Sequence, residues 1–402
     1  MSLPDWVNDQ GFQQIVAAVG DRGGRVRAVG GAVRDYLLGR PIADVDLVTD
    51  LMPEDAGCAC TDAGLRVVPT GLAHGTQTIL AAGRSFELTT LRADVETDGR
   101  HAKVVFGQDW AVDAARRDFT VNALYADPDG TILDPLDRGR ADIIARRLCF
   151  IGDAAMRVRE DYLRILRFYR FHAQLGWLFA DDPGRAAIRD NLAGLAQLSG
   201  ERIWQEVRRL LAVADPAPVL QVMTADGVLP ALLPDIAVAD LMTRIACLPD
   251  RADPLVRLAA LVPRGGEGAD TVAALARRWR LSRGESRRLA LAAAATPEQF
   301  ATPEAVRRTK VACGAETAAD RLDLLLAAGE PISQESIAVV RDWAVPEMPV
   351  QGRDLLALGV PPGPQVGRLL QAVSDHWAAT DFTADRQACL DWLKAEGHLP
   401  GA

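Results

Sequence analysis

Two alternating aspartates follow a pair of glycines in the stretch "VGGAVRDYLLGRPIADVDL", which spans residues 29–47. Residues i and i+2 of a strand share one face, so we expect Asp44 and Asp46 to lie side by side while Val45 and Leu47 face the core. Adjacent carboxylates repel each other unless a cation lies between them, and oxygen ligands next to phosphate oxygens suit Mg²⁺. The spacing therefore predicts a magnesium site held by the two aspartates.

The glycines predict a phosphate site beside these carboxylates. Gly30 and Gly31 end a predicted strand, and a helix is expected to begin directly after them. Glycine lets a ligand approach the backbone closely, and free amides at the start of a helix attract phosphate. Arg34 follows within one turn and can pair with a phosphate oxygen. Asp50 is expected instead to cap the helix that begins at Pro53. The whole stretch predicts a site for a nucleoside triphosphate.

A second group of charged residues recurs at every third position: Asp161, Arg164, Arg167 and Arg170. One interpretation is a helical ladder of exposed ion pairs, each worth about 0.3 kcal/mol. The other is a protein template for a base, in which Asp161 accepts from an exocyclic amino group and Arg164 donates to the adjacent ring nitrogen. Cytosine and adenine offer those groups, whereas uracil and guanine present the opposite polarity.

The charge of the chain is unevenly distributed. Its 402 residues carry a net charge of −9, which argues against a protein that binds polyanions without selectivity. Residues 146–170 depart from this average, because they contain seven arginines and only three acidic residues. Such segregation is typical of an enzyme that meets an anionic ligand in one cleft.

The sequence also bears on the cellular location. No apolar run approaches the roughly 20 residues that span a membrane. The N-terminal residues lack the basic and then apolar layout of a signal peptide. The six cysteines are scattered, and only Cys58 and Cys60 lie close together. We interpret them as reduced thiols of a cytoplasmic protein without membrane contact.

Turn residues separate short β-branched runs in the first third of the chain, which predicts strands. These runs cover residues 25–30, 44–49, 65–71, 75–83, 85–92 and 102–107. Helical patterns flank them at residues 8–19, 32–39, 53–63 and 111–125. After residue 136 the periodicity is helical almost throughout. We therefore expect an α+β chain, in which a small α/β domain with a mixed sheet precedes an all-helical remainder.

Several motifs together resemble a known family. Gly-Gly-x-Val-Arg-Asp, Leu-Leu-Gly and Asp-x-Asp in residues 29–47 are similar to the signature of the tRNA nucleotidyltransferase/poly(A) polymerase superfamily of bacterial type. The further motifs, in order, are "TGLAHGTQTI" (70–79), "FELTTLR" (86–92), "RRDFTVNALYAD" (116–127), "DP" (134–135), "EDYLRILRFYRF" (160–171) and "SGERIWQEVRRLL" (199–211). The detailed similarity covers residues 25–215.

The resemblance implies a domain order and an activity. A nucleotidyltransferase head of the polymerase-beta-like type would occupy residues 1–136, and a helical neck with the nucleotide-selecting motif residues 137–215. A helical body (216–345) and tail (346–402) would bind tRNA. The implied activity is template-independent addition of CCA to the 3′ end of tRNA, with CTP and ATP as donors. With Mg²⁺ as cofactor, the primer 3′-hydroxyl would attack the α-phosphorus.

Site residues follow partly from the residues and partly from the resemblance. Asp44 and Asp46 are the expected metal ligands and catalytic residues. Arg117, the second arginine of a pair expected to begin a helix-like run, would contact the nucleotide. The predicted nucleotide-binding residues are Gly31, Arg34, Arg117, Asp161, Arg164, Arg167 and Arg170.

Other residues leave two interpretations open. Glu87 is either a third catalytic carboxylate or a surface residue of its strand. Asp118 and Asn122 either hold their loop through side-chain to backbone bonds or contact the ligand. His74 is expected to shape the turn before Gly75. The family pattern after Arg92 continues through an acidic loop to Arg-Arg-Pro, but His101 and Ala102 stand in its last two places, which leaves the role of this loop open.

Neighbouring functions remain as alternatives. A poly(A) polymerase would use ATP alone and carry an extended basic tail, which is absent here, and partial CC- or A-adding enzymes share every motif quoted above. A non-catalytic RNA-binding relative would have lost the metal carboxylates. A fused phosphohydrolase module would need a His-Asp pair, and none of the five histidines precedes an aspartate. The oligomeric state does not follow from the sequence.

Overall fold

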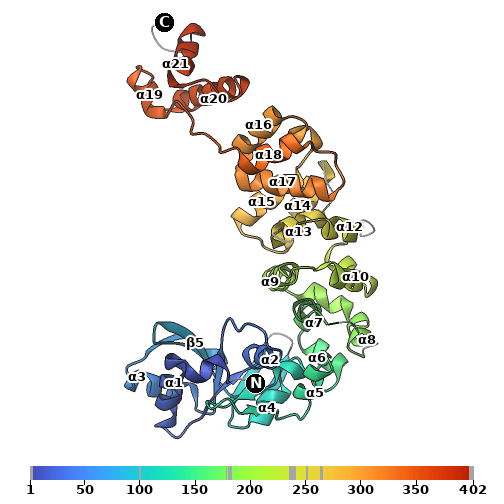
Figure 1. Cartoon of the computed structure of the whole chain (residues 1–402). Coiled ribbons are helices and arrows are strands. Elements are labelled where there is room, and N and C mark those ends of the chain that lie inside the picture. The colour runs from blue at the N-terminus through green and yellow to red at the C-terminus, as the bar shows by residue number, and fades with distance from the viewer. Residues whose placement is uncertain are drawn as a thin grey trace. The chain divides into compact units, whose positions relative to one another are not determined.

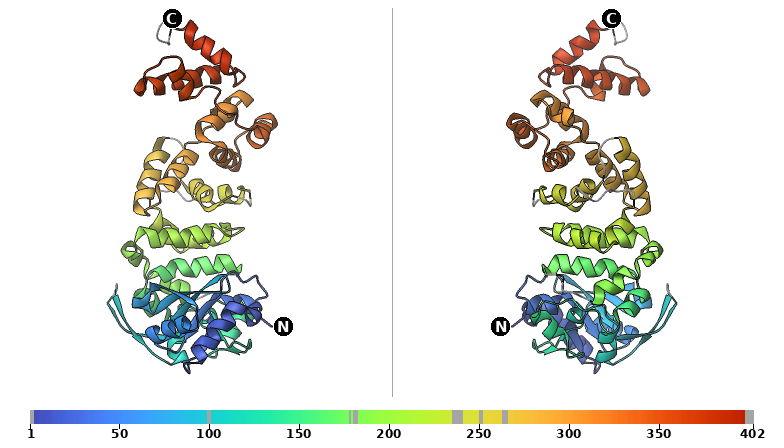
Figure 2. Two further views of the ribbon diagram at one scale, coloured as in Figure 1. Left: turned by 90° about the vertical axis from the view of Figure 1, so that its left-hand side faces the viewer. Right: turned by 90° about the vertical axis from the view of Figure 1, so that its right-hand side faces the viewer.

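The computed structural model describes residues 3–98, 101–177, 179, 183–234, 241–249, 252–262 and 266–397. Within these ranges all of the strands lie before residue 136, in the blue-to-cyan part of the chain (Figure 1). The part from green to red is helical (Figure 2). The expected α+β order, with strands first and helices after them, is confirmed.

The main sheet has seven strands in the order β3-β4-β5-β2-β1-β8-β9, and β6 pairs with β7 in a separate hairpin. The bounds are β1 Val26–Val29, β2 Asp46–Thr49, β3 Arg66–Gly71, β4 Thr76–Ala81, β5 Arg84–Thr90, β6 Arg92–Asp98, β7 His101–Phe106, β8 Tyr125–Ala126 and β9 Ile132–Leu133. β2 runs parallel to β5, and the other pairings of the described strands are antiparallel. The sheet is therefore mixed, as predicted.

Four α-helices accompany the strands: α1 Gln10–Gly20, α2 Gly31–Leu37, α3 Pro53–Asp62 and α4 Trp110–Ala115. The next group consists of α5 Gly139–Ile144, α6 Ala154–Glu160, α7 Leu163–Leu175, α8 Pro183–Arg189, α9 Gly200–Leu211, α10 Ala217–Ala225 and α11 Val228–Leu232. The last group consists of α12 Leu241–Ala246, α13 Pro254–Leu261, α14 Gly266–Arg278, α15 Arg283–Ala293, α16 Pro303–Cys313, α17 Ala315–Ala327, α18 Gln334–Asp342, α19 Gly352–Ala357, α20 Pro364–Ala379 and α21 Arg386–Ala395. No helix of the described ranges combines the length and apolar character needed to cross a membrane.

The chain divides into two compact units. One comprises Met1–Leu210 and Pro218–Leu232, and the other comprises Leu211–Ala217 and Leu233–Ala402. Within the second unit, α19, α20 and α21 bury an apolar cluster of their own, which includes Leu355, Trp377 and Leu393. The finer division into head, neck, body and tail stays a prediction.

The two faces of the sheet differ near the aspartate strand β2. Leu47 is buried on one face, and α1 and α3 pack together on that side of the sheet. On the other face Val48 is buried in a cluster with Ala114 of α4 and Tyr125 of β8. Asp46 shares this second face but is exposed, so the cover provided by α4 stops before the start of β2. The Asp46 side chain is therefore open to solvent at the start of β2.

The predicted helix over residues 111–125 is wrong beyond Ala115. Arg116 caps the end of α4, and a 3₁₀ turn at Thr120–Asn122 follows before β8. Asp118 stabilises this break, because its carboxylate accepts hydrogen bonds from the Phe119 amide at 2.8 Å and from Asn122 Nδ2 at 3.2 Å. Arg116 and Arg117 therefore end a helix instead of beginning one.

The expected helix cap at Asp50 is also wrong. Its carboxylate accepts hydrogen bonds from the Arg25 amide at 2.6 Å and from Arg25 Nε at 3.0 Å, so it joins the ends of β1 and β2. Met52 stands at the N-cap of α3 and makes no side-chain capping bond. Asp50 lies two residues before that position, and its carboxylate is already bound by the Arg25 amide.

The segment after Arg92 forms the hairpin β6–β7, whose tip, residues 99 and 100, lies outside the described residues. Its base is fixed to the turn that contains His74 and Gly75. Arg92 Nη1 donates to the His74 carbonyl at 2.8 Å, and a Cβ placed on Gly75 would lie 2.5 Å from the Phe106 ring. Gly75 also has a φ of +74°, so this turn requires glycine, and the predicted turn role of His74 is confirmed.

His172 of α7 predicts a pH-dependent stability. The residue is 2% exposed, and its ring stacks on that of Phe179 with the two ring centres 4.0 Å apart. Burial lowers the pKa of His172 from 6.5 to about 4. The unfolded chain therefore binds a proton between these pH values and the folded chain does not, so stability is lost as the pH falls below 6.5. From pH 7 to pH 5 we expect this group to cost about 2 kcal/mol. Denaturant unfolding of wild type and His172→Phe at both pH values measures the difference, and equal losses in the two proteins would contradict the expectation.

Candidate active site

Two of the predicted carboxylates lie on neighbouring strands, Asp46 on β2 and Glu87 on β5, and Asp44 lies two residues before β2. Val45 and Leu47 are buried while Asp44 and Asp46 are exposed, so the alternation expected from the sequence is confirmed. Leu47 of β2 pairs with Leu88 of β5, which places Glu87, one residue earlier, beside Asp46 on the same exposed face. The expected adjacency of these two strands is thereby confirmed.

The electrostatics of Asp46 show how close these groups are. Its carboxylate reaches solvent, yet the surrounding protein removes enough water to raise its pKa. The negative charges of Glu87 and Asp44 raise the pKa further, and the guanidinium of Arg117 opposes them. A divalent cation would relieve this repulsion, so the donor set fits such an ion.

The glycine pair begins α2. Gly30 has a φ of +69° and precedes the helix, and its amide donates to the Leu124 carbonyl at 3.1 Å. A Cβ placed on Gly30 would lie 3.7 Å from Arg117 Nη1. Arg34 is buried, and it donates to both oxygens of Asp35 and, through Nη1, to Asn122 Oδ1 at 2.8 Å. Asn122 has a structural role, but its side chain bonds to the side chains of Arg34 and Asp118 and not to the backbone as considered from the sequence.

Arg116 and Arg117 share one buried carboxylate, that of Asp113. Arg116 donates to Oδ1 from Nε and Nη2 at 2.9 and 2.7 Å, and Arg117 donates to Oδ2 from the same two atoms at 3.1 and 2.9 Å. The Tyr125 hydroxyl donates to Oδ2 at 2.7 Å. Sequence reasoning missed Asp113, although its position three and four residues before the two arginines matches the spacing of helical ion pairs.

A pocket of about 220 Å³ brings residues of two sequence motifs together. Its lining consists of Arg116, Arg117, Asp118, Asp161, Arg164 and Arg167. Four of these were predicted as nucleotide-binding residues, and they come from segments more than forty positions apart. Gly31, Arg34 and Arg170 do not belong to this lining.

The two predicted base-reading residues are held by different partners. The sequence predicted Asp161 on a helix, but this is wrong. Asp161 has extended backbone angles and precedes α7. Its Oδ1 accepts from the Leu163 amide at 3.1 Å and its Oδ2 from Arg202 Nη2 at 2.7 Å. Arg164 Nη1 donates to Glu160 Oε2 at 2.6 Å and to the Arg157 carbonyl at 2.8 Å.

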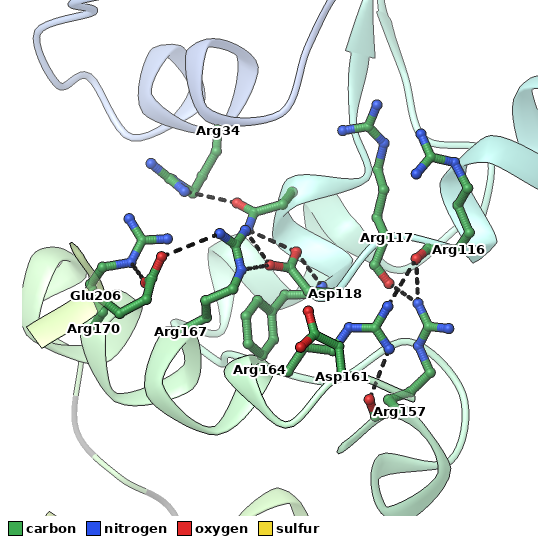
Figure 3. A network of polar contacts seen from close by, with 12 residues as sticks. Arg34, Arg116, Arg117, Asp118, Arg157, Asp161, Arg164, Arg167, Arg170 and Glu206 are labelled. Carbon is green, nitrogen blue, oxygen red and sulfur yellow. Dashed lines mark hydrogen bonds and ion pairs between the residues drawn. The ribbon is translucent and has the colours of Figure 1, made fainter. Parts of the chain in front are cut away.

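Arg157 ties this loop to the Arg116–Arg117 motif. Its Nη2 donates to the Arg116 carbonyl at 2.5 Å and also to the Arg117 carbonyl (Figure 3). Its Nη1 donates to Glu160 Oε2 at 2.5 Å. Glu160 therefore receives both Arg157 and Arg164. Neither Arg157 nor Glu160 was singled out from the sequence. Arg157 acts through contacts about forty residues away, whereas Glu160 accepts from residues three and four positions away, a spacing common on exposed helices.

Arg167 and Arg170, the other two arginines of the series that recurs at every third position, are also ion-paired. Arg167 donates to Asp118 Oδ2 from Nε and Nη2 at 2.8 and 2.5 Å, and burial of Asp118 would raise its pKa, but Arg167 outweighs burial and lowers it. Arg170 Nε lies 2.6 Å from Glu206 Oε2, and both side chains are buried. Burial lowers the pKa of Arg170 to about 10. The interpretation of these residues as exposed ion pairs along a helix is therefore wrong.

In the described ranges no three histidine, cysteine, aspartate or glutamate side chains are already gathered around a metal position. All six cysteines are free thiols. A metal at Asp44 and Asp46 would thus need oxygen ligands from another molecule, which is how Mg²⁺ is commonly held next to phosphates.

Comparison with known proteins places the chain in a family. The profile of the Poly A polymerase head domain matches residues 26–149, and that of the "Probable RNA and SrmB- binding site of polymerase A" matches residues 184–240. The mitochondrial CCA tRNA nucleotidyltransferase 1 of Danio rerio is 34% identical over 391 residues, covering 92% of this chain and 86% of the relative. The CCA-adding enzyme of Geobacillus kaustophilus is 33% identical, with 91% of each chain covered.

Solved structures agree with these relatives. The Bacillus stearothermophilus CCA-adding enzyme in complex with CTP superposes with a TM-score of 0.76 at 29% identity, covering 97% of this chain and 98% of that chain. The similarity therefore extends through the helical part. In the sequence, the detailed motif similarity covered only residues 25–215. By its sequence and its fold, the chain belongs to the family of CCA-adding tRNA nucleotidyltransferases.

Proposed function

We propose that this protein adds CCA to the 3′ end of tRNA, with CTP and ATP as donors and without a nucleic-acid template. The observation that carries the proposal is the joint position of two groups: Asp46 and Glu87 on adjacent strands, and a pocket lined by Asp161 and Arg164. Arg117 links them, because it lines the pocket and its charge acts on Asp46. Names of full-length relatives support the same activity.

Members of this family use a divalent metal, and we propose Mg²⁺ held by Asp44 and Asp46. The bound ion would lower the pKa of the primer 3′-hydroxyl and neutralise charge on the triphosphate. Glu87, beside Asp46, adds a third negative charge to the same face. We assign it the role of a further catalytic carboxylate that keeps the cation on this face.

The triphosphate would lie between α2 and the end of α4. Gly31 lets its oxygens approach the backbone, and Arg117 presents a guanidinium next to Gly30. Arg34 completes the set, although its present partners are Asp35 and Asn122. These side chains bind and orient the nucleotide, so that the 3′-hydroxyl of the tRNA meets the α-phosphorus in line.

Asp161 and Arg164 would read the base. The Asp161 carboxylate has lone pairs left beyond the Leu163 amide and Arg202, so it can accept an exocyclic amino group as well. Arg164 Nη1 is fixed to Glu160, which orients the remaining donors of its guanidinium. Arg167 and Arg170 would stabilise this surface through Asp118 and Glu206 and contribute positive charge to the nucleotide site.

The helical body and tail, residues 216–345 and 346–402, would supply tRNA contacts. Exposed cations of the tail include Arg353, Arg368 and Lys394. Its apolar cluster is formed by its own residues, but Asp381 accepts a hydrogen bond from Arg307 of α16 and Phe382 packs against Trp343, so deletion after residue 345 also removes these contacts and the folding of the truncated protein is checked by thermal unfolding. We expect this deletion to weaken tRNA binding by about tenfold at constant salt, because phosphate contacts are lost, while the KM for CTP stays unchanged. An unaltered Kd for tRNA in a filter-binding titration would argue against a tRNA-binding tail.

A cytoplasmic location is proposed on the strength of the six free thiols. The relative from Danio rerio is mitochondrial by name, so fractionation of the source cells is the relevant test.

The activity itself is tested by incubating the purified protein with tRNA that lacks CCA and with CTP and ATP, separately and together. Extension by ATP alone would instead indicate a poly(A) polymerase.

A further inference from the structure

Asp113 is a buried charge with no part in the mechanism described so far. The residue is 0% exposed, and each of its carboxylate oxygens serves a different arginine. Oδ1 accepts both hydrogen bonds from Arg116, and Oδ2 accepts both from Arg117 together with the Tyr125 hydroxyl. Tyr125 in turn accepts a hydrogen bond from Arg117 Nε at 3.2 Å. Oδ1 also accepts a long hydrogen bond from the Arg92 amide at 3.4 Å, but all side-chain donors to the carboxylate are the two arginines and the tyrosine that binds Arg117.

These bonds determine which edge of Arg117 is left for a ligand. Nε and Nη2 are used by Asp113 and Tyr125, whereas Nη1 has no hydrogen-bond partner in the described part of the chain. Nη1 lies at the glycine pair, 3.7 Å from the position that a Cβ on Gly30 would take. The positive charge of Arg117 also opposes the rise in the pKa of Asp46 that burial and the neighbouring carboxylates cause. The open edge of Arg117 thus faces the space between α2 and the predicted metal ligands.

Charge balance leaves this cluster able to bind an anion. Burial would raise the pKa of Asp113, but Arg117 and Arg116 outweigh it and lower the pKa, so the carboxylate is ionised at neutral pH. One carboxylate against two guanidinium groups keeps a net charge of +1. The second guanidinium, that of Arg116, lines the same pocket. Asp113 therefore holds two like charges together at the pocket without cancelling both.

We propose that Asp113 is the positioning residue for the triphosphate, because it fixes Arg117 so that Nη1 points at the phosphates. This inference rests on the proposed function. Asp113 does not touch the nucleotide and takes no part in base selection. Its effect should be the same for every nucleoside triphosphate, since all of them carry the same triphosphate group.

Asp113→Asn in the full chain tests the proposal with little change in shape. The amide nitrogen cannot accept from a guanidinium, so one of the two arginines loses its partner. We expect the KM for CTP and the KM for ATP to rise by the same factor of about ten, with kcat within about threefold of wild type. The KM for tRNA and the preference for CTP over UTP should stay unchanged.

Asp226 offers a control of matched chemistry in the same unit. It is 3% exposed, and it accepts hydrogen bonds from two arginines, Arg185 and Arg189, and from the Tyr169 hydroxyl. Asp226→Asn removes the same kind of buried acceptor away from the pocket. It should lower the melting temperature to a similar extent while leaving the KM for both nucleotides at its wild-type value.

A purely structural Asp113 predicts a different result. In that case both Asn variants lose stability alike and neither changes the KM for CTP or ATP, which would overturn the proposal. If Asp113→Asn does not fold, Tyr125→Phe provides the test. Loss of the Tyr125 hydroxyl should raise the KM for CTP and the KM for ATP about threefold. An unchanged KM in this variant would overturn the proposal. Wild-type protein without CCA addition would refute the function itself, whereas an active wild type with these negative results refutes only the role of Asp113.

Discussion

Asp46→Ala should lower the rate of CMP transfer to tRNA by about a thousandfold or more, since metal activation of the primer hydroxyl and the triphosphate is worth several kcal/mol. The fold should survive, because Asp46 is exposed and its neighbours Glu87 and Asp44 already disfavour its charge. The thermal unfolding midpoint of the variant is expected to equal or exceed that of wild type. Single-turnover transfer with labelled CTP measures the rate independently of product release.

A matched control is available on α3 of the same head. Asp55 is an exposed aspartate outside the site, so Asp55→Ala removes the same charge without touching β2 or β5. We expect it to transfer CMP at the wild-type rate. If Asp46→Ala kept more than about a tenth of wild-type turnover, Asp46 would not be a metal ligand.

The second large effect concerns selection of the base. Arg164→Ala should reduce the preference for CTP over UTP by about ten- to a hundredfold, because each unmet group at a buried base edge costs roughly 1–3 kcal/mol. Asp161→Ala should act in the same direction. Steady-state kinetics with the four triphosphates on tRNA lacking CCA gives the four values of kcat/KM from which the preference follows.

The partners of these residues decide which variants are informative. Exchanging Asp161 and Arg164 would place an arginine against Arg202 and a carboxylate against Glu160, so like charges would meet at both positions. The single alanine variants avoid this conflict. Arg159→Ala, which removes an exposed arginine from α6, is the control and should leave selectivity unchanged. Unaltered preference in both single variants would reduce Asp161 and Arg164 to structural residues.

Local patterns predicted six of the nine strands in the described residues and the exposed carboxylates, but they missed β6, β8 and β9. The alternation of Asp44, Val45, Asp46 and Leu47 reports burial directly, because one face of a strand lies on the core and the other does not. The same locality explains why the turn at Gly75 was predicted: a positive φ is a property of the residue itself.

Contacts between distant segments were beyond the sequence. The helix expected through residue 125 ends at Ala115, where Asp118 binds the nearby Phe119 amide and Asn122 and also Arg167, which lies 49 residues further along the chain; no pattern of period 3.6 contains that last contact. Asp161 leaves the predicted helix for a similar reason, since Arg202 of α9 takes its carboxylate. Propensity was overridden by tertiary hydrogen bonds at both places.

Asp113 is an intermediate case. Its spacing to Arg116 and Arg117 is visible in the sequence, but the same spacing occurs on many exposed helices. Complete burial and the hydroxyl of Tyr125 distinguish it, and both arise only when β8 folds against α4.

CCA addition is tested most directly with three tRNA substrates that end before the CCA, after the first C and after the second C. Each is incubated with a single labelled triphosphate and the products are resolved at single-nucleotide length. The proposed function predicts that CTP extends the first by two residues and the second by one, that ATP extends only the third and by one residue, and that UTP and GTP extend none. Extension of any of them by a run of adenosines, or failure of either the CTP or the ATP step, would contradict it.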